Sequence, residues 1–84
     1  MIETLPQVQV AMRVIDGRGN YDPGPIAELE VAAREGWLGE TIAVRVSEPE
    51  TVESVLAWID ATGHGLIGLY ECHGYEEVIV EIRH

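Results

Sequence analysis

The chain has 84 residues, a formal net charge of −10 and 46% hydrophobic residues, and its five basic residues are all arginines. This length corresponds to one small domain, which we expect to span residues 1–84 with residues 1–7 as a loose lead-in. The acidic balance argues against direct binding to nucleic acid or to an anionic membrane surface, because both need a basic footprint. A basic protein partner would be favoured.

The sequence contains one cysteine, Cys72, and therefore cannot form an internal disulfide. A reducing compartment fits this composition, and we expect a cytoplasmic protein. The N-terminus has neither the basic region nor the long apolar core of a signal peptide. No apolar run reaches the length of a membrane span.

The first part of the chain predicts a strand and then a helix. Apolar residues alternate from Val8 to Ile15, which is the period of a strand. Asp22 and Pro23 are a strong helix start, because a carboxylate can accept hydrogen bonds from free backbone N–H groups and proline fits the first turn. An apolar stripe at helical spacing follows and Gly36 is a stop signal, so we expect a helix over 23–35.

The middle of the chain repeats this order. Residues 41–47 alternate again and predict a second strand. Ser47 and Glu50 have the spacing of a capping box, in which each side chain bonds to the other residue's backbone N–H. An apolar stripe then predicts a second helix that ends near Thr62, before Gly63.

The last part of the chain reads as a hairpin. We expect strands over 66–72 and 77–83, joined by a turn at 73–76 whose glycine can take a positive φ. The element order is therefore β-α-β-α-β-β. It predicts an α/β two-layer sandwich, with a four-stranded mixed sheet, both helices on one face and a right-handed crossover between the first two strands.

Side-chain parity predicts which residues lie on the sheet face that the helices leave open. The charged residues of this parity are Arg13, Arg45, Glu81 and Arg83, and the apolar ones are Ala11, Ile15, Ala43 and Ile79. In the third strand, parity points Leu66, Tyr70 and Cys72 inward and Ile67, Leu69 and Glu71 outward. A face that mixes arginines with apolar groups is either a partner surface, with Arg13, Arg45 and Arg83 as its basic members, or an ordinary solvated sheet face.

Residues 16–25 read D-G-R-G-N-Y-D-P-G-P and resemble the signature of the TusA/SirA-like sulfur-carrier family, D-x-R-G-x-x-C-P-x-P. The matching positions are Asp16, Arg18, Gly19, Pro23 and Pro25. The cysteine position is occupied by Asp22. Weaker similarities follow in the family's order, in residues 39–44 (G-x-x-L-x-V), 47–49 (T-D-P), 63–66 (G-H-x-L) and 82–84 (I-R-K).

The resemblance implies a role in sulfur trafficking. In this family the signature cysteine carries sulfur as a persulfide between protein partners, without a cofactor. Asp22 can cap the helix as a thiolate would, but a carboxylate has no S–S chemistry, so we expect no catalytic residue there. We expect a binding or regulatory module, a monomer or weak dimer, that meets a component of a sulfur-relay pathway. Its contact loop would comprise Asp16, Arg18, Gly19, Tyr21, Asp22, Pro23 and Pro25.

Two alternatives stay open. Cys72 is the only sulfur nucleophile and could carry sulfur in place of the missing thiol, although a strand directs its neighbour His73 to the opposite face. The shared fold could also serve an unrelated small interaction domain. We expect no metal site, because His64, His73, His84 and Cys72 lack a recognised ligand spacing.

Overall fold

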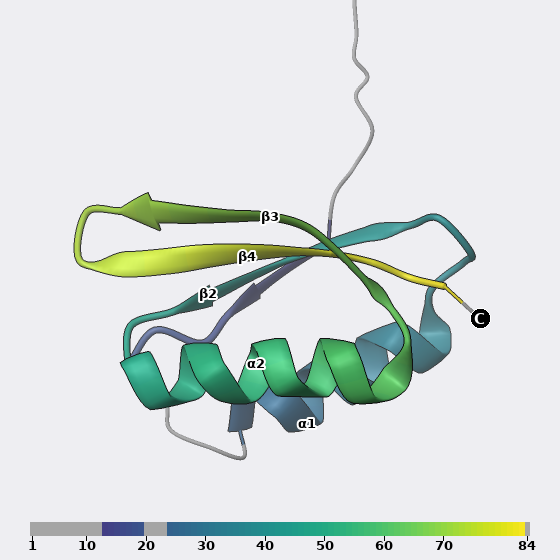
Figure 1. Cartoon of the computed structure of the whole chain (residues 1–84), viewed down its shortest axis with the longest axis horizontal. Coiled ribbons are helices and arrows are strands. Elements are labelled where there is room, and N and C mark those ends of the chain that lie inside the picture. The colour runs from purple at the N-terminus through teal and green to yellow at the C-terminus, as the bar shows by residue number, and fades with distance from the viewer. Residues whose placement is uncertain (1–12, 20–23, 84) are drawn as a thin grey trace, which may run out of the picture.

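The computed structural model describes residues 13–19 and 24–83. The elements are β1 (Arg13–Asp16), α1 (Gly24–Glu35), β2 (Thr41–Val46), α2 (Pro49–Thr62), β3 (Gly65–Cys72) and β4 (Tyr75–Glu81). The predicted order and the mixed four-stranded sheet are confirmed, with strand order β1-β2-β4-β3. Both helices cover one face of this sheet, which gives the predicted two layers (Figure 1). The first residues of the predicted strand at Val8 and of the predicted helix at Pro23 lie outside the described residues.

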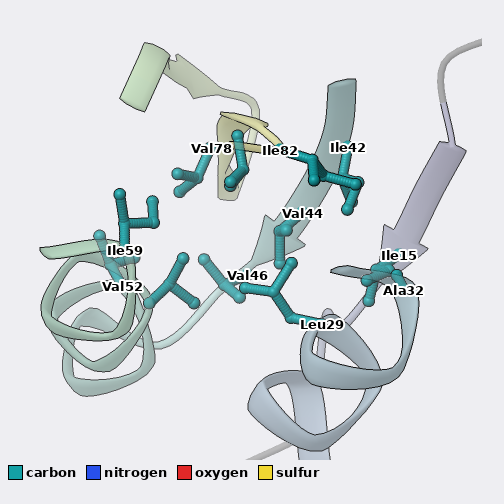
Figure 2. Packing of buried hydrophobic residues seen from close by; sticks show 12 residues of the cluster. Ile15, Leu29, Ala32, Ile42, Val44, Val46, Val52, Ile59, Val78 and Ile82 are labelled. Carbon is teal, nitrogen blue, oxygen red and sulfur yellow. The ribbon is translucent and has the colours of Figure 1, made fainter. Parts of the chain in front are cut away.

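The core lies between the sheet and the two helices. β1 and β2 are parallel, and β4 pairs antiparallel with both β2 and β3. The alternating residues Ile42, Val44 and Val46 of β2 are fully buried, as their period of two predicts. Leu29 of α1 and Val55 of α2 are equally buried in the same cluster. Figure 2 shows these β2 side chains directed at the helix layer.

The start of α2 differs from the prediction. Glu48 is the N-cap residue and makes no side-chain capping hydrogen bond, so the predicted capping box of Ser47 and Glu50 is wrong. The Ser47 hydroxyl oxygen instead accepts a hydrogen bond from the backbone N–H of Gly19, at 2.9 Å. The predicted stop at Gly63 is confirmed, because this residue has φ 82° and donates its N–H to the carbonyl of Ile59.

The predicted phase of β1 is also wrong. Ile15 is 5% exposed and belongs to the core, whereas Val14 is 47% exposed. Pairing explains the phase, since Ile15 lies opposite Val44 and therefore shares the helix-covered face with it. Arg13 has the same parity as Ile15 and bonds to Glu35 at the end of α1, with Nη1 to Oε1 at 3.2 Å. Both parities of this stretch are rich in apolar residues, so the pattern alone could not select the buried one.

The predicted phase of β3 fails at a β-bulge. The register shifts between Leu66 and Gly68, and the extra residue exchanges the two faces for the rest of the strand. Tyr70 and Cys72 lie opposite Glu77 and Tyr75, on the face that β4 turns away from the helices. Their predicted inward placement is therefore wrong beyond the bulge. Leu69 and Glu71, predicted to point outward, share the helix side with Val78 and Glu76.

Candidate functional site: the signature loop and its neighbours

The loop after β1 is held by an ion pair between two residues of the signature. The Arg18 guanidinium donates from Nε to Asp16 Oδ1 at 2.8 Å and from Nη2 to Asp16 Oδ2 at 2.7 Å. The backbone N–H of Arg18 also donates to Oδ1, at 3.2 Å. These hydrogen bonds from Arg18 lower the pKa of Asp16 from 3.8 to about 2, and the charge of Arg45 adds to the effect. The pair therefore stays ionised at neutral pH and fixes the first turn of the loop.

Gly17 allows the loop to approach both α1 and β2 closely. Its N–H donates to the carbonyl of Arg45 at 2.8 Å, which extends the pairing of β1 with β2 by one residue. A methyl group on Gly17 would lie 2.9 Å from Cγ of Pro25 and 3.0 Å from the Arg45 carbonyl oxygen. Pro25 is itself fully buried. The second signature proline is therefore a packing residue that seats the first turn of α1 against the loop.

Gly19 ties the same loop to the start of α2. It has φ 81°, a left-handed conformation that favours glycine. Its N–H bonds to the Ser47 hydroxyl, so the loop is fastened to the junction between β2 and α2. The glycine of the signature thus provides both the turn and the bond that orients it.

Arg18 also connects the loop to the β3–β4 hairpin. Its guanidinium carbon lies 4.9 Å from the centre of the Tyr75 ring, which is a cation–π arrangement. Tyr75 pairs across the hairpin with Cys72, the half-buried thiol of the chain. The loop, the β2–α2 junction and the hairpin end therefore meet at one end of the sheet, on the left in Figure 1.

A small hollow lies at this end, between the hairpin and the first turn of α2. Its volume is about 220 Å³, and its walls include Ser47, Pro49, Cys72, Tyr75 and Glu76. The strand register places the Cys72 side chain on the open face, and its Sγ lies 3.9 Å from the carbonyl oxygen of Tyr70. The described contact of the thiol is therefore with the backbone of its own strand.

The other predicted partner residues are dispersed. Arg45 lies opposite Glu77 on the open face and is paired with it at 3.0 Å, and Arg83, beyond the end of β4, is paired with Glu81 at 2.9 Å. Arg13 lies on the helix side, so the predicted surface of three arginines does not form. Tyr21, Asp22 and Pro23 lie outside the described residues.

Sequence reasoning missed Ser47 and Tyr75 as neighbours of the loop. The local sequence, a serine before Glu-Pro, also predicts a helix cap. Only the fold shows that the Ser47 hydroxyl bonds to Gly19 and does not cap α2. Tyr75 is far from the loop in sequence, and nothing in the local pattern points to Arg18.

His64, within a segment that resembles G-H-x-L, joins the end of α2 to the end of the sheet. Its Nδ1 accepts the backbone N–H of Arg83 at 2.9 Å, and its ring stacks on Trp58 with centroids 5.2 Å apart. Within residues 13–19 and 24–83, no group of three or more potential metal ligands occurs. None of the described helices is long and apolar enough to cross a membrane.

Two comparisons found proteins that are similar to this chain. No protein-family model matches the chain. A protein of Archaeoglobus fulgidus named "Putative sulfur carrier protein" is 29% identical over 70 residues, which is 83% of this chain and 96% of that protein. The crystal structure of a SirA-like protein from Desulfitobacterium hafniense matches with a TM-score of 0.75 and 22% identity, again over 83% of this chain and 96% of the other. The second likeness is one of fold.

Proposed function

Because the chain belongs to the TusA/SirA-like sulfur-carrier family, we propose that it acts in sulfur trafficking as a partner-binding or regulatory module that does not itself carry sulfur. One observation carries the proposal: Asp22 occupies the signature's thiol position in the sequence, while the described signature residues contact one another or the scaffold. The signature loop would be recognised by a protein of a sulfur relay, and Asp22 would present an anion in place of a thiolate.

The contacts within the loop support retention of a partner surface. Asp16 bonds to Arg18, Gly17 admits Pro25, and Gly19 bonds to Ser47. None of these contacts needs a thiol. A partner that recognises the shape and charge of the loop could therefore still bind it. Persulfide transfer at position 22 would be lost, because a carboxylate cannot form an S–S bond.

The test is a sulfur-loading assay with a cysteine desulfurase and cysteine, read by intact-protein mass. We expect the wild-type protein to gain no mass, and the Asp22→Cys variant in a Cys72→Ser background to gain one sulfur atom, about 32 Da. Cys72→Ser alone is the matched control and should behave as wild type. Loading of the wild-type chain would contradict the proposal, and a folded Asp22→Cys variant that resists loading would show that the loop differs from the family's.

A second candidate is sulfur carriage by Cys72. The observation that favours it is its place, since Cys72 pairs with Tyr75 and the ring of Tyr75 lies under Arg18 of the signature loop. In this route the Cys72 thiolate would attack the outer sulfur of a donor persulfide. A new S–S bond would form at Cys72, the donor's S–S bond would break, and the donor would leave as a thiolate. The same assay decides, because this route predicts a gain of about 32 Da that Cys72→Ser abolishes.

A further inference from the structure

The β3 edge of the sheet is open and unusually apolar. β3 is the last strand in the order β1-β2-β4-β3, and among the described residues it pairs only with β4. One row of its backbone N–H and C=O groups therefore faces away from β4. Its large apolar side chains are between 45% and 56% exposed, and they are Leu66, Ile67, Leu69 and Tyr70.

Proteins usually protect such an edge with charges, prolines or very short strands. β3 is 8 residues long and its one charged residue is Glu71, near its end. The bulge between Leu66 and Gly68 disturbs the first part of the edge, but pairing is regular from Gly68 to Cys72. The edge thus keeps a regularly paired segment, residues 68–72, beside which another strand can pair.

A hollow between α2 and β3 would accept side chains from such a strand. Its volume is about 410 Å³, and its apolar wall consists of Leu56, Ile59 and Leu66. On this helix side, a residue of an added strand would enter beside Leu66, while the next residue would lie over the open face. The site therefore offers backbone pairing together with a pocket for alternate side chains, which is how extended peptides are bound at sheet edges.

The charges at the two ends of the edge define the occupant. Asp60 of α2 lines the hollow at the beginning of β3, and Glu71 lies at the other end, opposite Glu76. The cation near this groove, Arg83, is already paired with Glu81. An apolar edge between acidic ends matches an extended segment that has apolar residues in its middle and Lys or Arg at its ends.

We propose that β3 binds an extended, basic segment of a partner protein as an additional strand, with apolar side chains seated between α2 and β3. The hollow beside Leu66 lies at the opposite end of β3 from the hairpin that contacts Arg18 of the signature loop, and the inference does not depend on whether that loop carries sulfur. A second copy of the chain fits less well, because its β3 brings no cation and would add a second Glu71 and Asp60 to the groove.

The test uses the full chain and a short synthetic peptide of alternating valine and threonine with two lysines at each end. We expect the peptide to shift the amide NMR signals of β3 and to slow hydrogen exchange along its outer row. Asp60→Lys combined with Glu71→Lys should weaken binding about tenfold, as expected for two reversed charges at a binding rim. Glu28→Lys with Glu30→Lys, which makes the same change of net charge on the exposed side of α1, is the matched control and should bind as wild type.

Three results would overturn the proposal. The first is a set of shifted signals that excludes β3. The second is equal binding of a peptide with glutamates in place of the lysines, or equal weakening by the control variant, since charge complementarity would then play no part. The third is self-association through β3 in sedimentation experiments without added peptide, which would assign the edge to a second copy of the chain.

Discussion

Gly17→Ala tests whether close packing at the signature loop holds the start of α1 in place. The added methyl group would lie 2.9 Å from Pro25 Cγ and 3.0 Å from the Arg45 carbonyl oxygen. Both neighbours are rigid, since Pro25 is a buried ring in a helix and the Arg45 carbonyl belongs to β2 and accepts the N–H of Gly17. The loop must therefore move away from β2 or from α1. The first movement weakens the hydrogen bond from Gly17 to Arg45, and the second weakens the packing of Pro25.

Overpacking of this kind costs about 1–3 kcal/mol of unfolding free energy. For a domain of this size each kcal/mol lowers Tm by roughly 4–8 °C, which thermal unfolding followed by circular dichroism resolves easily. Gly68→Ala is the matched control: its methyl group would meet the ring of Tyr70 at 2.6 Å, but that ring is an exposed side chain that can rotate away. If Gly17→Ala melts at the wild-type temperature, or no lower than Gly68→Ala, the close approach of loop, helix and strand is not what holds α1.

Two further predictions concern the bonds of the same loop. The pKa of Asp16 is lowered to about 2, so the folded state binds its proton less readily than the unfolded state, and the stability that Asp16 contributes is present above about pH 4 and lost as pH falls toward 2. Urea midpoints should therefore fall more steeply between pH 5 and pH 2 for wild type than for Asp16→Asn. Glu28→Gln is the control and should follow the wild-type curve. Parallel curves for wild type and Asp16→Asn would contradict a stabilising role of the Asp16 carboxylate. Ser47→Ala removes the acceptor of the Gly19 N–H and should cost about 0.5–1.5 kcal/mol in urea unfolding, whereas an unchanged midpoint would mean that water replaces the hydroxyl without loss.

The elements and their order could be predicted from the sequence because each depends on local periodicity and on nearby start and stop residues. The alternation in β2, the apolar stripes of α1 and α2 and the stop at Gly63 all act within a few residues. The faces of β1 and β3 could not be predicted in this way. The phase of β1 follows from its pairing with β2, and that of β3 changes at the bulge by Leu66, a feature of pairing geometry that the side-chain pattern does not encode.

The same distinction applies to the candidate site. The resemblance identified Asp16, Arg18, Gly19 and Pro25 as a unit, and these residues do converge at one end of the sheet, but it could not name their distant neighbours. Ser47 was assigned to the α2 cap because its local sequence satisfies that rule, yet the fold uses its hydroxyl for Gly19. The Ser47 hydroxyl could accept a hydrogen bond from the start of α2 or from Gly19, and the tertiary structure determines which bond forms. Local rules fail at such positions.

The contacts of the signature residues explain how a chain can resemble this family without the cysteine that carries the persulfide. The described signature residues bond to one another or to the scaffold: Arg18 holds Asp16, and Pro25 packs on Gly17. These contacts hold the described part of the loop, and none of them involves a thiol. A carboxylate at a helix start can accept hydrogen bonds from free backbone N–H groups, but it cannot form the S–S bond of a persulfide. The signature residues therefore indicate the fold, whereas the proposed lack of sulfur carriage depends on the residue at position 22, which loading of the Asp22→Cys variant tests.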